Sequence, residues 1–167
     1  AIAIEPTGNL VVGGQCEMPA TGADFCMVRI DSFGTLDGGF GLSGWVTTSV
    51  SPANADSANA IVLEPGGRII LGGPCDYATV TGVNFCLARY ARDGKLDRSF
   101  GNNGLTFTSY VASTPGGQSD VLTGLIKLGD GRLLAGGHCD TMTATGVDLC
   151  LMRFSAGPKD ADYAEGG

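Results

Sequence analysis

Apolar residues in this chain occur in short runs that return in the same order three times. A first run of mostly apolar residues begins at Ala1, Ala60 and Gly124, with the sequences AIAIEP, AIVLEP and GLIKLG. After a glycine-containing turn comes a second run that ends in two glycines, LVVGG, IILGG or LLAGG. Runs this short, bounded by turn residues, predict β-strands. Because they are apolar at nearly every position, we expect both faces of these strands to be covered.

Two further runs complete the repeated unit. The third run reads FCMVRI, FCLARY or LCLMRF and begins at Phe25, Phe85 or Leu149. The fourth reads WVTTSV from Trp45 or LTFTSYV from Leu105, and the third copy has no equivalent of it. Hydroxyl side chains interrupt the fourth run, at Thr47, Ser49, Thr106 and Thr108. This alternation is typical of an exposed outer strand. With four runs in each of the first two copies and three in the third, the chain holds eleven strand candidates.

These runs predict an all-β fold, because no window of ten or more residues has the periodicity of an amphipathic helix. The 28 glycines among 167 residues fit many short strands and tight turns. We expect a domain over residues 1–154, in copies of about 60 residues at 1–59, 60–123 and 124–154. Each copy would form a four-stranded antiparallel blade of a β-propeller. A β-trefoil, also built from three four-stranded copies, is the alternative.

The elements DGKLDRSFGNNG, PGGRIILGG and NFCLARY carry a resemblance to a known family. The chain resembles the delta-60 repeat family of bacterial proteins, which are assigned as β-propellers, over residues 1–154. The resemblance implies a propeller-like repeat domain in surface or secreted bacterial proteins, and it implies no catalytic residues. The chain departs from the family pattern in its cysteine pairs. After Phe154 the third copy also loses the LDxSFG element, which is replaced by an acidic, glycine-rich tail at 155–167.

Six cysteines form one close pair in each copy. The two cysteines of a pair lie 10, 11 and 11 residues apart, whereas the distance between copies drifts from 59 to 64 residues. A cysteine spacing that stays nearly constant while the distance between copies varies indicates a local constraint on each pair. We therefore expect disulfides within each copy, worth about 2–3 kcal/mol each, and an extracellular, cell-surface or periplasmic location. Zinc is disfavoured by the spacing and by the single histidine. The expected pairs are Cys16–Cys26, Cys75–Cys86 and Cys139–Cys150.

The charge balance narrows the classes of partner. The formal net charge is −7 and the basic residues are not clustered, so we expect no nucleic-acid partner. No apolar run approaches 18 residues, so we expect no membrane-inserted helix. The sequence begins inside a repeat and without Met, which suggests a removed leader or a piece of a longer chain.

The third run of every copy contains an arginine. Arg29, Arg89 and Arg153 could bind an anion, but an arginine at one repeated strand position more often pairs with a repeated carboxylate. Asp37 and Asp97 of the LDxxFG element are the expected partners. We predict structural ion pairs at these residues.

Other polar residues offer little chemistry. His138, the only histidine, replaces Gln15 and Pro74 of the other copies and has no nucleophile nearby in sequence. The tail carboxylates Asp160, Asp162 and Glu165 lack the spacing of a calcium loop. We therefore expect no catalytic residue, no metal site and no cofactor.

The paired glycines lie inside strands and not before a helix, so a bulge or a close backbone approach explains them better than phosphate binding. They are Gly13–Gly14, Gly72–Gly73 and Gly136–Gly137.

Three function classes remain open. We favour a non-enzymatic module that binds or assembles. Because propellers have four to eight blades, three blades should require self-association or further repeats of a longer chain. The alternatives are a propeller hydrolase with a metal in its central channel and a glycan-binding domain. The aromatic residues available for stacking on a sugar are Trp45, Tyr77, Tyr90 and Tyr110.

Overall fold

The computed structural model describes residues 1–51, 55–76, 82–108, 119–140 and 146–155. These residues form eleven β-strands and one short 3₁₀ turn, Pro65–Gly67, so the fold is all-β as the sequence predicts. Within this part of the chain no helix is long and apolar enough to cross a membrane.

The first two copies each form a four-stranded antiparallel sheet whose strands follow one another in chain order. In each sheet the second and third strands are long and the first and fourth are short. The first sheet contains β1 (Ile2–Ile4), β2 (Leu10–Met18), β3 (Gly22–Ile30) and β4 (Trp45–Thr48). The second contains β5 (Ala60–Glu64), β6 (Arg68–Asp76), β7 (Val83–Tyr90) and β8 (Leu105–Thr108).

The third copy forms a three-stranded sheet in the described residues. It consists of β9 (Val121–Lys127), β10 (Leu133–Asp140) and β11 (Val147–Phe154). The register of β9 against β10 shifts at Gly136/Gly137, which is a β-bulge.

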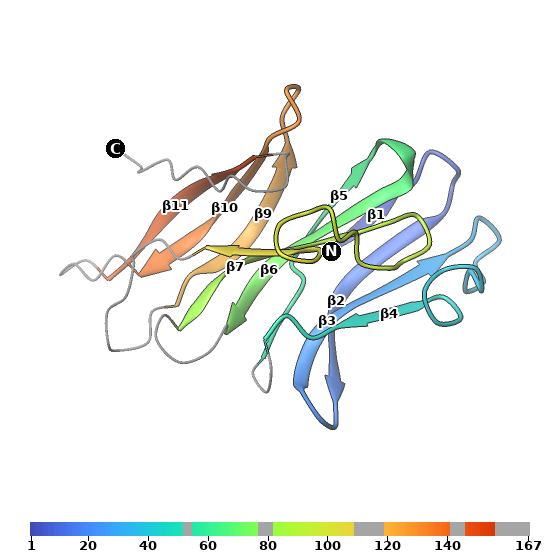
Figure 1. Ribbon diagram of the computed structural model, residues 1–167, viewed down its shortest axis with the longest axis horizontal. Helices are drawn as coiled ribbons and strands as arrows, with labels where there is room; N and C mark the ends of the chain where they lie inside the picture. The colour runs from blue at the N-terminus through green and yellow to red at the C-terminus, as the bar shows by residue number, and fades with distance from the viewer. Residues whose placement is uncertain (52–54, 77–81, 109–118, 141–145, 156–167) are drawn as a thin grey trace.

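The three sheets stand side by side like blades of a fan, with the second sheet in the middle (Figure 1). Their first strands lie next to one another, because β5 contacts both β1 and β9. This arrangement is that of propeller blades, and the three sheets do not close into a ring. The β-trefoil alternative is wrong, because trefoil strands share one barrel, whereas here each copy forms its own sheet.

The core lies in two layers between the sheets. One layer, between the first and second sheets, contains Phe25, Met27, Leu71 and Tyr90. The other, between the second and third sheets, contains Phe85, Leu87, Leu122 and Met152. Side chains alternate between the faces of a strand, so the second sheet contributes to both layers. Each outer sheet contributes one face only.

The expectation that the first two strands of every copy are covered on both faces is therefore wrong for the outer sheets. In β1, Ile2 and Ile4 are 67% and 69% exposed, and in β9 Ile126 is 56% exposed. The physical reason is position: in the described structure each outer sheet has a neighbouring sheet on one side only.

The fourth strands take the expected outer positions, β4 beside β3 and β8 beside β7. In β4 the exposed side chains include Thr47, as the alternation suggested. In β8 the half-exposed residue is Phe107, whereas Thr106 and Thr108 are partly covered.

Candidate functional site

The repeated arginine of the third strand is the centre of a charged cluster in the first copy. Arg29, on β3, is buried, and its Nε donates a hydrogen bond to Asp37 Oδ2 at 2.8 Å. Its Nη2 lies 2.8 Å from the same oxygen. A second carboxylate, from Glu5 at the end of the first run, approaches Arg29 Nη1 to 3.6 Å. One cation is thus held between two carboxylates.

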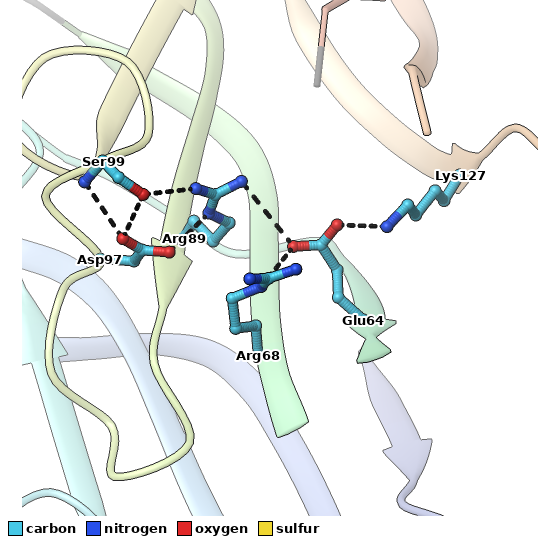
Figure 2. A network of polar contacts seen from close by, with 6 residues as sticks. All are labelled: Glu64, Arg68, Arg89, Asp97, Ser99 and Lys127. Atoms are coloured by element: carbon cyan, nitrogen blue, oxygen red, sulfur yellow. Dashed lines mark hydrogen bonds and ion pairs between the residues drawn. The ribbon is translucent and has the colours of Figure 1, made fainter. Parts of the chain in front are cut away.

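The second copy repeats this cluster around Arg89 on β7 (Figure 2). Arg89 Nε donates to Asp97 Oδ2 at 3.0 Å, and Nη2 donates to Ser99 Oγ at 3.0 Å. Arg89 Nη1 lies 3.9 Å from Glu64 Oε2. Glu64 makes two further ion pairs. Its Oε2 lies 3.4 Å from Arg68 Nε, and its Oε1 lies 2.5 Å from Lys127 Nζ. This buried carboxylate is therefore surrounded by three cations.

Local backbone structure brings the aspartate of LDxxFG to the arginine. The N–H of Asp37 donates to the carbonyl of Arg29, and the N–H of Asp97 donates to the carbonyl of Arg89. The phenylalanine of the same element lies against the guanidinium. The Phe40 centroid is 4.2 Å from Arg29 Cζ, and the Phe100 centroid is 4.7 Å from Arg89 Cζ. The element therefore supplies both an ion pair and a cation–π contact.

The two aspartates are held in the ionised form. The pKa of Asp37 is lowered mainly by the backbone N–H of Gly39, with Arg29 adding to the effect. The pKa of Asp97 is lowered mainly by the Ser99 hydroxyl, and Arg89 contributes further. Because the buried guanidinium groups are engaged by fixed carboxylates, the geometry suits a structural role better than capture of a free anion.

The third copy lacks this cluster. Arg153, on β11, pairs with no carboxylate in the described part of the chain. Leu128 takes the position that Glu5 and Glu64 hold in the other copies, and the LDxxFG element is absent. The third copy therefore has neither of the carboxylates that surround Arg29 and Arg89.

The charged clusters also join neighbouring sheets. Arg29 Nη1 donates to the carbonyl of Arg92 in the second sheet at 2.8 Å. Lys127 of the third sheet reaches Glu64 of the second. Asn59 Nδ2 donates to the carbonyl of Leu122 at 2.9 Å. Each contact spans 63 residues, which is about one repeat.

Sequence reasoning missed Glu5 and Glu64, and it missed the aromatic partners Phe40 and Phe100. The sequence does contain a signal for the two glutamates. The dipeptide Glu-Pro ends the first run in the two copies that have LDxxFG, and it is missing from the copy that lacks it.

A second missed feature is a buried aspartate four residues before the second and third copies. Asp56 accepts hydrogen bonds from the N–H groups of Val50 and Ser51 and from the Ser51 hydroxyl. Burial raises its pKa. Asp120, at the equivalent position, accepts from the N–H of Asp140 at 3.3 Å. Both carboxylates therefore bind backbone N–H groups of other segments. Sequence reasoning missed them because the sequences around them differ between the copies.

The structure joins the cysteines within each copy, as the constant spacing predicts. The Cα–Cα distances are 5.5, 5.8 and 5.9 Å for Cys16–Cys26, Cys75–Cys86 and Cys139–Cys150. Each bond links the second and third strands of its sheet. Three such bonds are typical of a protein in an oxidising compartment.

The paired glycines include two positions of close backbone approach. A Cβ at Gly73 would lie 1.7 Å from the carbonyl oxygen of Ser57, and one at Gly137 would lie 2.0 Å from that of Val121. At Gly14, the equivalent position of the first copy, a Cβ would meet nothing within 4 Å. In the second copy the linker residue Ser57 occupies this space, and in the third copy the start of β9 occupies it.

The remaining candidates are dispersed. His138 lies exposed on β10, opposite Leu149. Tyr90 is fully buried, its hydroxyl donates to Thr48 Oγ1, and burial raises its pKa, so it cannot stack on a sugar. Trp45 is 46% exposed. Tyr77, Tyr110 and the tail residues Asp160, Asp162 and Glu165 lie outside the described residues.

Two further observations concern ligands. In the described residues no three His, Cys, Asp or Glu side chains gather as a metal site would require. A groove of about 990 Å³ runs between β4 and the second sheet, and Thr47, Lys95, Arg98 and Asn103 are among its lining residues.

The comparisons with known proteins agree with the fold. The family described as "Domain of unknown function (DUF5122) beta-propeller" matches residues 65–100, from the turn after β5 to the phenylalanine of the second LDxxFG element. Over this segment the chain is similar to a β-propeller repeat family. No curated protein matches the chain.

Proposed function

We propose that the chain is a non-enzymatic β-propeller repeat module of the delta-60 type, and that it acts by binding or assembly. Its three disulfides favour an extracellular, cell-surface or periplasmic location.

The observation that carries this proposal is an uncovered apolar face at the end of the repeat array. Phe25 and Phe85 are completely buried, whereas Leu149, at the same position of the third copy, is 86% exposed. A contiguous apolar face of this kind marks an interaction surface.

The charged residues that repeat between copies support a structural module. Arg29 and Arg89 are buried with their carboxylates inside the sheets, so they stabilise the repeat rather than present reactive groups. In the described residues no three His, Cys, Asp or Glu side chains gather as the metal site of a hydrolase would require. The hydrolase alternative therefore has no group of residues in its support.

Glycan binding has one observation in its favour. The groove between β4 and the second sheet offers hydroxyl, amide and cationic side chains, including Thr47, Asn103 and Lys95. Against it, the aromatic Trp45 has Leu105 as its counterpart in the second copy, so no aromatic site repeats.

Light scattering over a range of protein concentrations, together with a glycan array, tests the proposal. We expect the average mass to rise above 17.0 kDa with concentration. A chain that stays monomeric throughout, and that also binds no glycan, would contradict a role in binding or assembly. Turnover of a substrate by the purified protein would contradict the non-enzymatic assignment.

A further inference from the structure

The outer face of the first sheet, here called the rear face, and the outer face of the third sheet, here called the forward face, both expose apolar side chains. We propose that the forward face docks on the rear face of a second copy, head to tail, with the packing that already joins neighbouring sheets within the chain. This inference rests on the proposed assembly function and names its partner. The forward face comprises Ile126, Leu134, Val147, Leu149 and Leu151. The rear face comprises Ile2, Ile4, Val12, Val28 and Ile30.

The forward face repeats a surface that is buried wherever another sheet follows. Strand register places Leu149 and Leu151 at the positions of Phe85 and Leu87 in the second sheet. Phe85 and Leu87 are completely buried, whereas Leu149 and Leu151 are 86% and 55% exposed. The residues are equally apolar in both sheets, so only the following sheet is missing. The surface is therefore built to receive a sheet of this repeat.

The residues of the rear face are equivalent to residues that, in the second and third sheets, pack against the preceding sheet. Val12 and Val28 of the first sheet correspond to Leu71 and Ala88 of the second, which are completely buried against the first sheet. Ile2 corresponds to Leu125 of the third sheet, which is buried against the second. In the first sheet these positions are half-buried or exposed. The two faces are thus the two sides of one junction.

A glycine in each forward face makes room for an apolar side chain of the following sheet. A Cβ at Gly13 would lie 3.0 Å from Leu71 Cδ2, and one at Gly72 would lie 3.2 Å from Leu125 Cδ2. Gly136 holds the same position in the third sheet. In a docked second copy, the residues equivalent to Leu71 and Leu125 are Val12 and Ile2, which are similar or smaller in size.

The polar positions of the junction are compatible as well. Within the chain, Glu64 meets Lys127 of the following sheet. At the proposed junction the equivalent residues are Leu128 and Ile4, so both partners of this contact are apolar.

Arg153 has a partner at the same junction. It is equivalent to Arg29, which donates to the carbonyl of Arg92 in the following sheet. In a second copy the equivalent carbonyl belongs to Ser32.

Head-to-tail contacts close into a ring when the rotation permits. Two copies bring together six sheets, which lies within the four to eight blades of known propellers. We therefore infer a closed dimer in which both junctions are identical.

The experiment uses two variants that each spoil one face, Leu149→Asp on the forward face and Ile4→Asp on the rear face. A single unpaired carboxylate buried at the junction should weaken association by roughly 100-fold or more. Sedimentation velocity should therefore show each variant as a monomer at concentrations where the parent chain is a dimer. Phe33→Asp, at a turn residue that is 91% exposed and lies on neither face, is the matched control and should dimerise like the parent.

Mixing the two variants gives the decisive result. The intact rear face of Leu149→Asp meets the intact forward face of Ile4→Asp, so a one-to-one mixture should recover a dimer joined at one junction. Circular dichroism of each variant checks that the sheets have folded.

Two results would overturn the inference. A dimer of Ile4→Asp alone would mean that two forward faces meet each other, and assembly as a function would survive with another geometry. A monomeric parent chain at every concentration would mean that a second copy is not the occupant of these faces. Whether the proposed function also fails is then decided separately by the glycan array.

Discussion

At the residue scale, two buried arginines hold together the turns and strands of their own copies. Each guanidinium contacts an aspartate and an aromatic ring of the LDxxFG element and a glutamate at the end of the first run. Removing the cation leaves Glu5 or Glu64 buried with fewer partners. A buried ion pair broken on one side is more costly than an intact pair is stabilising.

We predict that Arg89→Met lowers the free energy of unfolding by roughly 3 kcal/mol. Arg153→Met is the matched control, because Arg153 holds the same strand position but pairs with no carboxylate in the described residues. It should change stability by less than about 0.5 kcal/mol. Urea unfolding of both variants, at concentrations where the chain is monomeric, measures the difference. Equal losses would show that the carboxylates are not the reason.

The pH dependence of stability should reveal Asp97. Its pKa in the folded state is lowered from the ordinary value of 3.8 by Ser99 and Arg89. Its contribution is therefore fully present above pH 3.8 and is lost as the pH falls through the lower folded pKa. We expect Asp97→Asn to be less stable than the parent at neutral pH, and the gap to close below pH 3.8. Thermal melting from pH 7 to pH 2 measures the gap, and a constant gap would contradict this assignment.

At the element scale, the second strands of the second and third copies are shaped by the backbone that leads into each copy. Gly73 in β6 leaves room for the carbonyl of Ser57 in the linker, and Gly137 in β10 leaves room for that of Val121, the first residue of β9. In the linker before the second copy, buried Asp56 accepts hydrogen bonds from the N–H groups of Val50 and Ser51. The first copy has the same glycine pair, but a Cβ at Gly14 would meet open space. One sequence motif therefore has different consequences in different copies.

We predict that Gly73→Ala lowers the free energy of unfolding by about 2–3 kcal/mol, because a Cβ there would overlap the Ser57 carbonyl oxygen and force the backbone apart. Gly14→Ala makes the same chemical change at the equivalent strand position. It should be neutral within about 0.5 kcal/mol. Denaturant midpoints compare the two. If Gly14→Ala were as harmful as Gly73→Ala, strand propensity rather than the linker contact would be responsible.

At the scale of the whole molecule, stability is divided between sheets and the junctions that join them. Each sheet contacts its neighbours mainly, so the array should behave as a sum of repeat and junction contributions. The junction between the second and third sheets combines the apolar layer with the Lys127–Glu64 ion pair. This pair is the only connection shown in Figure 2 between the third sheet and the cluster around Arg89.

We predict that Lys127→Met lowers the free energy of unfolding by roughly 1–2 kcal/mol, since Glu64 keeps Arg68 and Arg89 as partners. Hydrogen exchange should accelerate in β9 and β10 and stay unchanged in the first sheet. Lys95→Met is the control, because Lys95 is exposed and pairs with Asp93 inside one turn. Uniform acceleration over all three sheets would argue against a local junction.

Several features could be predicted from the sequence because they repeat within it. The constant cysteine spacing indicated a bond between neighbouring strands, and the structure contains that bond in each copy. The short apolar runs indicated the strands, and each run that lies in the described residues forms one. The shared position of Arg29 and Arg89 suggested Asp37 and Asp97 as partners, and the structure places each aspartate within hydrogen-bonding distance of its arginine.

Only the tertiary structure decided which faces are covered. Ile2 and Leu149 are as apolar as their counterparts in the middle sheet, and a strand pattern records which residues are apolar but not whether a neighbouring sheet is present. The same holds for Gly73, whose role depends on a linker folded against it. The role of Glu64 also depends on tertiary structure, because its three cationic partners lie on three strands in two sheets. The sequence by itself determined local strand order and covalent links, because both depend on residues close together in the chain. Burial and the joining of sheets depend on residues about one repeat apart, and these meet only in three dimensions.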